Sequence, residues 1–412
     1  MIREIDTAAR LVGITMAGLS LVYVVACIVL TWRWQRHVRA SLVSTSGPSA
    51  RALPAGARAG RPSISVLKPL CGSEPGLERN LRSFCEQEYP AYEVVVGARS
   101  AGDPALAVAR RVAATARGHV QVLAGSYELG SNQKVNTLAR LAMHARSEIL
   151  VLADSDICVG PTYLATLAEA LGDPSVGVAT CLYRGAPTGS VWSRLGALSI
   201  DEWFAPSVLV ARAVGSEAYC SGATIAVRRD VLARSGGFEA LAPLLADDYE
   251  LGRRVRALGL RCVIVPYEVA TTVDEPSLSA LVAHELRWTR TIRTVEPLGH
   301  FCSVVTYTIP MAALAALMAG RDRWVLALLP VAVLCRLVLH WVVRRGLVVA
   351  RQQVPAMPRG GRGTAWLVPL RDILSFGVWA ISFANRRVTW RQQAMQVRAD
   401  GVLHGSEEAM PA

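Results

Sequence analysis

The order of hydrophobic and polar positions divides the chain into two apolar ends and a middle of short alternating elements. Near the start, Leu11–Thr31 contains no Asp, Glu, Lys or Arg, and this length suits a hydrocarbon layer of about 30 Å. A signal peptide would have a shorter apolar core and a small-x-small cleavage site after it. We therefore predict a retained transmembrane anchor over residues 11–32, after a short tail of residues 1–10.

A second apolar region lies near the other end of the chain. Residues 297–320 lack formal charge, and residues 324–343 contain only one arginine and one histidine. Both stretches are predicted to cross the membrane. Residues 364–385 are predicted to be re-entrant or transmembrane, because Arg371 and Asp372 interrupt them, and these two residues are expected to form a satisfied pair with each other. A basic tail, residues 386–412, follows.

The middle of the chain predicts an α/β domain over residues 63–275. A basic linker, residues 33–62, precedes it, and short apolar runs then alternate with amphipathic stretches of helix length. This alternation indicates a mostly parallel sheet with right-handed crossovers, whose ligands bind beyond the carboxyl ends of the strands. The predicted strands are Ile64–Lys68, Tyr92–Gly97, Val120–Leu123 and Glu148–Ala153, and the predicted helices are Pro75–Glu88, Asp103–Arg117 and Gln133–Arg146.

Composition and charge favour a membrane protein. Apolar residues make up 52% of the chain, mean hydropathy is +0.32, and the net charge is +12. The basic charge could serve nucleic acid or an anionic membrane, and the apolar excess favours the membrane without nucleic acid. Arginines follow the first apolar stretch before any acidic residue, so the domain is expected in the cytoplasm. The nine scattered cysteines form no C-x-x-C pair, which favours free thiols.

Two acidic motifs are candidates for chemistry. Asp154-Ser-Asp156 closes the fourth predicted strand, where carboxylates suit Mg²⁺ or Mn²⁺ bridging two phosphates, although such residues also cap helices. Asp247-Asp248 opens a predicted helix, where it supplies either a general base or an N-terminal cap. Neither G-x-G-x-x-G nor G-K-[ST] follows the first strand, which disfavours dinucleotide and P-loop sites.

A third motif, His284-Glu-Leu-Arg287-Trp288, lies on a predicted amphipathic interface helix, residues 276–296. It does not continue as the zinc motif H-E-x-x-H, because Trp288 stands where the second histidine would be. Arg287 could contact a diphosphate and Trp288 could form a wall against a sugar or base. The alternative is that both residues anchor the helix on the bilayer.

Taken in order, these motifs resemble the family-2-type glycosyltransferases, in particular the ceramide glucosyltransferase branch with its bacterial hopanoid-biosynthesis-associated members. The likeness covers about residues 60–300, and the arrangement of apolar segments extends it to the whole chain. It implies a GT-A-like nucleotide-diphospho-sugar transferase domain flanked by transmembrane helices. The matching segments are Ser65–Gly72, Gln87–Glu93, Asp103–Ala105, Asn132–Asn136, Leu152–Asp156, Cys220–Gly222, Arg228–Leu232, Gly236–Phe238, Asp248–Tyr249 and Arg287–Trp288.

The resemblance also implies roles for individual residues. The catalytic base is Asp248. The donor-binding residues are Lys68, Asp103, Lys134, Asn136, Asp154, Arg287 and Trp288, the acceptor-side residues are Cys220, Ser221, Gly222 and His284, and the metal ligands are Asp154 and Asp156. Two positions depart from the family pattern. Ser100 stands where an acid is expected, so that either Asp103 substitutes for it or a contact to the nucleobase is weaker, and His284 stands where Gln or Arg is expected.

By this resemblance the protein is expected to be a metal-dependent, UDP-sugar-dependent inverting transferase in a bacterial inner membrane, with several spans. It would move one N-acetylglucosamine from UDP-GlcNAc to a lipid alcohol, a hopanoid polyol. The alternative is transfer of glucose from UDP-glucose to ceramide. A processive polysaccharide synthase is more remote because it needs more C-terminal spans for a polymer channel. A non-catalytic nucleotide-sugar binder is disfavoured by Asp154 and Asp248.

Overall fold

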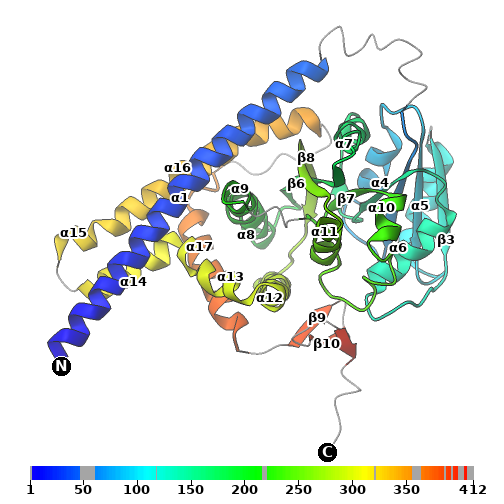
Figure 1. Cartoon of the computed structure of the whole chain (residues 1–412). Helices are drawn as coiled ribbons and strands as arrows, with labels where there is room; N and C mark the ends of the chain where they lie inside the picture. The colour runs from blue at the N-terminus through cyan, green and yellow to red at the C-terminus, as the bar shows by residue number, and fades with distance from the viewer. Residues whose placement is uncertain are drawn as a thin grey trace, which may run out of the picture.

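The structure is a computed structural model that describes residues 2–46, 61–116, 118–215, 220–319, 322–354, 363–384, 387–390, 393–397 and 403–405. An α/β unit lies beside a group of long helices, and the first helix runs along that group (Figure 1). This helix, α1 (Ile2–Ser46), packs against α14 (Thr308–Ala319) and α16 (Leu328–Gln353).

The α/β unit is built on an eight-stranded sheet in the order β3-β2-β1-β4-β7-β6-β8-β5. The four strands predicted from the sequence are present, and β1 pairs in parallel with both β2 and β4. The sheet is mostly parallel, as predicted, because six strands share one direction; β7, between β4 and β6, and β5, beside β8, run antiparallel to their neighbours and make the sheet mixed. The strands are β1 (Ile64–Leu70), β2 (Tyr92–Ala98), β3 (His119–Ala124), β4 (Ile149–Ala153), β5 (Ile157–Cys158), β6 (Val176–Pro187), β7 (Thr224–Arg228) and β8 (Arg261–Val273).

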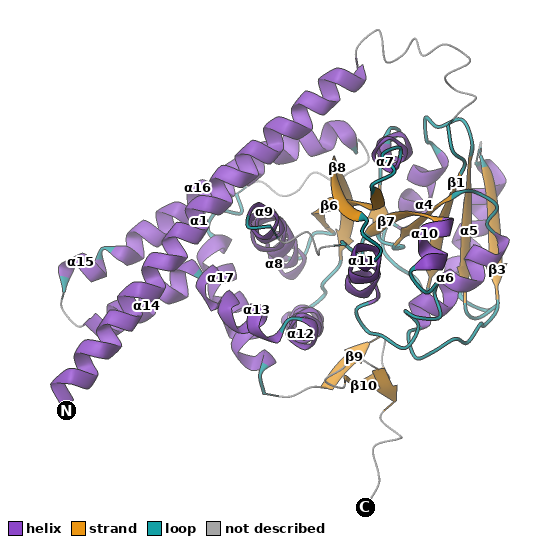
Figure 2. Ribbon diagram, in the orientation of Figure 1, coloured by secondary structure: helices purple, strands orange, loops and turns teal. Residues whose placement is uncertain are grey.

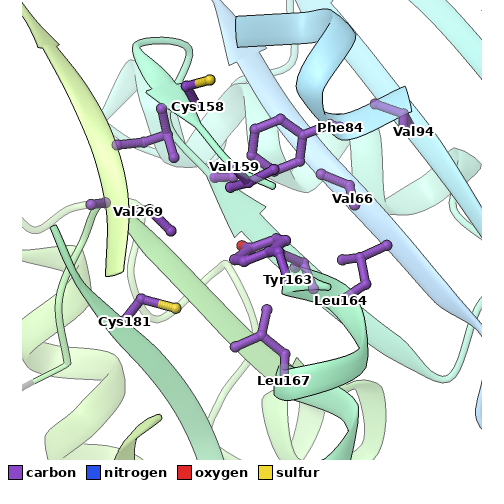
Figure 3. Packing of buried hydrophobic residues seen from close by; sticks show 14 of the residues in the cluster. Val66, Phe84, Val94, Cys158, Val159, Tyr163, Leu164, Leu167, Cys181 and Val269 are labelled. Atoms are coloured by element: carbon purple, nitrogen blue, oxygen red, sulfur yellow. The ribbon is translucent and has the colours of Figure 1, made fainter. Parts of the chain in front are cut away.

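Helices cover this sheet (Figure 2). On one face, Phe84 meets Tyr163 edge-on with ring centroids 5.6 Å apart, among the buried side chains of β1 and β2 (Figure 3). The helices of the unit are α4 (Leu77–Cys85), α5 (Pro104–Thr115), α6 (Gln133–His144), α7 (Tyr163–Leu171), α8 (Val191–Ser199), α9 (Ala205–Ala213), α10 (Arg229–Arg234) and α11 (Asp247–Ala257).

Two helical segments, Thr7–Leu42 and Arg323–Gln353, are long and apolar enough to cross a membrane. The first contains the predicted anchor, and α1 continues to Ser46, so the start of the predicted basic linker is helical. The reason is burial: Trp34 and Val38 on this extension pack against the α/β unit. The second contains α15 (Arg323–Leu326) and α16.

The stretch predicted as one span over residues 297–320 is broken. It forms α13 (Pro297–Cys302), the 3₁₀ turn η2 (Ser303–Thr306) and α14, and the two halves meet at a bend of 72°. Pro310 lacks a backbone N–H and is tolerated in the first turn of a helix, so a new helix begins here instead of the old one continuing.

The last apolar stretch forms α17 (Leu367–Ser382), and its two charged residues do not pair with each other as expected. Arg371 donates to both carboxylate oxygens of Glu285 at 2.7 and 2.6 Å, and Asp372 lies 3.3 Å from the guanidinium of Arg336. Consecutive helical residues point about 100° apart, so each charge meets a different neighbouring helix. Beyond α17, the predicted tail contains a small antiparallel sheet of β9 (Arg387–Trp390), β10 (Gln393–Val397) and β11 (Leu403–Gly405).

Buried hydrogen bonds tie the long helices to the sheet. Trp34 of α1 donates to Glu268 of β8 at 2.8 Å, and Glu268 also accepts two bonds from Arg184 of β6. The side chain of Gln353, at the end of α16, bonds to the backbone of β8 at Glu268 and Pro266. The long helices and the sheet therefore share one set of buried polar contacts.

Candidate active site

The Asp154–Asp156 motif forms a turn at the carboxyl end of β4. The carbonyl of Asp154 accepts bonds from Lys68 Nζ at 2.6 Å and from the Ile157 amide at 3.3 Å. Asp156 accepts from Thr271 Oγ1 at 2.6 Å. Burial, followed by the charge of Asp154, raises the pKa of Asp156 to about 6. The turn therefore brings the two carboxylates close enough for the charge of Asp154 to disfavour ionisation of Asp156.

Lys134, in the first turn of α6, reaches across to this turn. Its Nζ lies 2.7 Å from Asp154 Oδ1 and 3.4 Å from the carbonyl of Gly222. Burial opposes its charge, but Asp154 and then Asp247 outweigh burial and raise the pKa of Lys134 above its usual value. Lys134 therefore stays cationic and joins the strand end, the acceptor-side segment and the start of α11.

Asp248 lies at the start of α11, facing Gly222. A β-carbon built on Gly222 would lie 2.6 Å from Asp248 Oδ2, so only glycine allows this approach without moving the carboxylate. The other oxygen accepts from the amide of Tyr249 at 2.8 Å. Burial, followed by the charge of Asp247, raises the pKa of Asp248 to about 6. A carboxylate with this pKa is suited to proton transfer near neutral pH.

Tyr183 connects the motif on α12 (Leu278–Val295) with these aspartates. Trp288 packs in one cluster with Tyr183. Burial, followed by the charge of Asp248, raises the pKa of Tyr183 above its usual value. His284 lies 2.6 Å from Glu275 through its Nδ1, and its ring meets Trp288 edge-on at 4.4 Å. His284 thus has a carboxylate partner that the sequence did not indicate.

Three of the residues predicted to bind the donor, Lys68, Asp103 and Asn136, have contacts within the protein. Lys68 is fully buried, with its ammonium 3.8 Å from the ring centroid of Phe84. Asp103 accepts from the amide of Gly72 with both oxygens, at 3.0 and 3.1 Å, and caps α5. Asn136 bonds to the 129–130 loop through its whole amide group. These contacts shape the loops around the site, and the roles of the three residues in donor binding stay a prediction.

The acceptor-side segment lies between β7 and the aspartates. Cys220 is buried, and the carbonyl of Ser221 accepts from Thr180. The Ser221 hydroxyl is also buried, without a hydrogen-bond partner among the residues that the structure describes. Arg287 lies on α12 one residue before Trp288. The structure therefore brings together the aspartates, Lys134 and Gly222. Trp288 is connected to this group by Tyr183, because the two aromatic residues belong to one cluster.

Sequence reasoning missed three residues that support the site. Asn132 caps α6 and donates to Asp247 at 3.3 Å, and its type and place before an amphipathic helix could have indicated a cap. Thr271 and Glu275, the partners of Asp156 and His284, lie far away in sequence and gave no local signal.

The two aspartates suit a divalent cation only if a bound substrate supplies further ligand atoms. Asp154 and Asp156 supply hard carboxylate oxygens, and burial, followed by the charge of Asp154, raises the pKa of Asp156, so a bound cation would favour the ionised form of Asp156. Within the described ranges, no group of three His, Cys, Asp or Glu side chains is arranged to hold a metal. The two carboxylates would therefore share Mg²⁺ or Mn²⁺ with phosphate oxygens and water.

Comparisons with known proteins agree with this chemistry. The model of a family described as Glycosyl transferase family 21 matches residues 16–403. Ceramide glucosyltransferase 1 of Caenorhabditis elegans is 24% identical over 206 residues, which are 49% of this chain and 44% of that protein. An N-acetylglucosaminyltransferase of Rhizobium leguminosarum bv. viciae is 23% identical over 243 residues, 56% of this chain and 55% of that protein. The chain thus spans about half the length of these curated relatives.

Among solved structures, a mannosyltransferase from Pyrobaculum calidifontis in complex with GDP-Man and Mn²⁺ is similar at 19% identity and a TM-score of 0.44. The similar region covers 88% of this chain and 98% of that one.

Proposed function

Because the chain belongs to glycosyl transferase family 21, and is therefore a glycosyltransferase, we propose that it moves one sugar from a nucleotide-diphospho-sugar to a lipid alcohol with inversion at the sugar carbon. The observation that carries this proposal is the approach of Asp248 to Gly222, beside the Lys134–Asp154 ion pair. A base facing the acceptor-side segment and a cation next to the strand-end carboxylates are the two groups such a transfer requires.

On the donor side, the task is to stabilise the charge that develops on the departing diphosphate. A cation held by Asp154 and Asp156 would neutralise phosphate oxygens. Lys134 stands beside the same carboxylate, and Arg287 on α12 supplies a guanidinium that can bind a phosphate with two hydrogen bonds. Trp288 provides an apolar wall, and like Tyr183 it packs against the cluster of Ala197, Ile200 and Val273.

On the acceptor side, Asp248 takes the proton of the lipid hydroxyl. As it does so, the hydroxyl oxygen forms a bond to C1 of the sugar, and the bond from C1 to the diphosphate oxygen breaks. The nucleoside diphosphate leaves with that bond's electron pair, so the attack comes from the opposite face and the configuration inverts. A positioned base of this kind contributes about 10²–10⁴-fold to the rate.

For the substrates we propose UDP-GlcNAc and a hopanoid polyol, on the resemblance of the motifs to the bacterial branch. The Rhizobium relative named as an N-acetylglucosaminyltransferase supports the sugar. The second candidate is glucose transfer to ceramide, which the relatives named as ceramide glucosyltransferases favour. We also propose that the catalytic domain faces the cytoplasm of a bacterial inner membrane, because the arginines after the first span follow the positive-inside bias.

The test uses full-length protein in detergent micelles and measures release of nucleoside diphosphate. UDP-GlcNAc and UDP-glucose are each combined with hopanoid polyol, with ceramide, or with no lipid, and products are identified by mass spectrometry. The proposal predicts acceptor-dependent release and a product with one sugar per lipid, which Asp248→Asn abolishes. Products with repeated sugars, or release that the Asp248 variant retains, would overturn it. The preferred pair of substrates decides between the two candidates.

A further inference from the structure

A buried carboxylate outside the aspartate cluster, Glu275, lies in the short connection between β8 and α12. Its side chain is 7% exposed, and one of its oxygens lies 2.6 Å from Nδ1 of His284. It is not the cap of α12, because Ser277 has that role and accepts from the amide of Ala280. The carboxylate therefore serves a side chain in the second turn of the helix rather than the helix end.

Hydrogen bonds with the start of α8 fix the backbone of Glu275. Its amide donates to Ser193 Oγ at 2.8 Å, and its carbonyl accepts from Ser190 Oγ at 2.6 Å. Its side chain passes close to Gly196, where an added β-carbon would lie 3.6 Å from Glu275 Cγ and 2.9 Å from Val273 Cγ1. The carboxylate is thus held in a narrow space, so it can fix the orientation of the imidazole ring that it contacts.

The other ring nitrogen of His284, Nε2, is open to a ligand. A carboxylate oxygen accepts hydrogen bonds, so the proton of the contact with Glu275 belongs to Nδ1. Nε2 has no hydrogen-bond partner among the residues that the structure describes, and the His284 side chain is 37% exposed. A carboxylate that binds one nitrogen and leaves the other free is a recurring way in which proteins orient a functional histidine.

The ring of His284 lies on the side of α12 that faces the candidate active site. His284 and Trp288 are four positions apart on the helix, and their rings meet edge-on with centroids 4.4 Å apart. Trp288 and Tyr183 pack against the same cluster. Burial, followed by the charge of Asp248, raises the pKa of Tyr183, so this tyrosine lies near the proposed base. A group bound at Nε2 would therefore lie beside the reacting substrates.

The charge of the pair decides what Nε2 can bind. One proton lies between Nδ1 and the carboxylate, so the pair has one net negative charge when Nε2 is unprotonated and no net charge when Nε2 is protonated. While this contact is kept, the pair is never cationic and lacks the positive charge that attracts a diphosphate. A hydroxyl group can donate or accept, and it fits Nε2 in either state.

We propose that Glu275 is a positioning residue, which holds His284 so that Nε2 binds a hydroxyl group of a substrate during the transfer. The inference rests on the proposed function, because that reaction brings together two substrates with hydroxyl groups, the nucleotide-sugar and the lipid alcohol. His284 touches the substrate, and Glu275 acts through His284.

The test measures kcat/KM of full-length protein in detergent micelles, with the nucleotide-sugar and lipid that the wild type prefers. Glu275→Ala should lower kcat/KM about tenfold, the effect of losing one oriented hydrogen bond. Glu275→Gln should stay within about threefold of the wild type, because its amide oxygen can still accept from Nδ1. In protein that already carries His284→Ala, Glu275→Ala should cause no further loss. The matched control is Asp274→Ala, because Asp274 is exposed and bonds to Thr188 instead.

The two KM values identify which substrate supplies the hydroxyl. A hydroxyl of the lipid predicts that Glu275→Ala raises KM for the lipid and leaves KM for the nucleotide-sugar unchanged, and a hydroxyl of the sugar predicts the reverse. Unchanged kcat/KM in Glu275→Ala would overturn the proposal. An equal loss with and without His284 would overturn it as well, since Glu275 would then act independently of the histidine.

A measurement without substrate tests the pair itself and does not require a variant of Glu275 to fold. Nitrogen NMR of protein with isotope-labelled histidine should show a proton on Nδ1 of His284 in the wild type, the signals being those lost in His284→Ala. Glu275→Ala should shift that proton towards Nε2. An unprotonated Nδ1 in the wild type would overturn the proposal. A wild type that transfers no sugar to any lipid would overturn the proposed function and the hydroxyl contact with it, whereas the NMR signals would still show whether Glu275 holds His284.

Discussion

Replacing Asp248 by Asn should stabilise the protein while it removes activity. A carboxyl with a pKa of about 6 is harder to ionise by about 3 kcal/mol than one with the ordinary pKa of about 3.9. The folded wild-type protein bears this free-energy cost when Asp248 is ionised. The Asp248→Asn variant does not, because an amide is uncharged. The amide oxygen can still accept from the Tyr249 amide, so that hydrogen bond is kept.

The sign of the pH dependence follows from the raised pKa. Below pH 4, Asp248 is protonated in both the folded and the unfolded protein, and the variant has no electrostatic advantage. As pH rises through 4 to 6, only the unfolded protein ionises freely, so the wild type loses stability relative to Asp248→Asn. The advantage of the variant should reach up to about 3 kcal/mol at pH 8 and shrink towards pH 4.

The assay compares thermal unfolding of the two proteins in the same micelles at pH 5 and pH 8, together with nucleoside diphosphate release. Turnover of Asp248→Asn should fall by about 10² or more, as expected for loss of a positioned base. Asp247→Asn is the matched control, and it should remain active. The wild-type rate should fall on the acid side of its pH profile near pH 6. Because Asp247 is the second cause of the raised pKa of Asp248, the Asp247→Asn variant should show this fall at lower pH.

Two results would refute this reasoning. An Asp248→Asn variant that is no more stable at pH 8 than the wild type would mean that burial and Asp247 do not strain the carboxylate. An Asp247→Asn variant that is the more damaged of the two in turnover would place the base one residue earlier.

Three other predictions test the parts around this base. Gly222→Ala should lower kcat by about tenfold to a hundredfold, because the added methyl displaces the Asp248 carboxylate. Gly102→Ala is the control and should keep kcat, because a β-carbon at Gly102 has no neighbour closer than 3.8 Å. Equal kcat values for the two variants would contradict the steric argument. Arg371→Ala, which leaves the Glu285 carboxylate buried without its partner, should lower the free energy of unfolding by about 3–5 kcal/mol, and exchanging the two residues should recover part of it; an unchanged thermal midpoint would speak against the pair. Asp154→Asn should raise the Mn²⁺ concentration for half-maximal activity at least about tenfold, and an unchanged metal response would leave this residue only its role in the turn.

The first half of the sheet was predictable because its signals are local. Each of the predicted strands β1 to β4 is a short apolar run flanked by an amphipathic helix, and β1, β2 and β4 are buried; Asp103 and Asn132 stand where helix caps are expected. The antiparallel insertion of β7 was not predictable, because a buried strand has the same apolar pattern in either direction.

The aspartates of the site could be predicted, but their surroundings could not. The motifs pointed to Asp154, Asp156 and Asp248 without showing that Gly222 is required by a contact with Asp248. That requirement exists only after residues far apart in the chain have met. The same holds for Arg371, whose neighbour in sequence was the expected partner and whose actual partner is Glu285, 86 positions away.

The hydrogen bond between Trp34 and Glu268 has a consequence for the order of events during synthesis. The two residues are 234 positions apart, so at about 5–20 residues per second the ribosome adds Glu268 on the order of ten to fifty seconds after Trp34. The hydrogen-bond acceptor of Gln35, the carbonyl of Val342, is synthesised later still, because it is 307 positions away. The first helix is therefore complete before the groups that later fix its end exist. Folding thus ends with a docking step, in which the first helix receives the completed sheet.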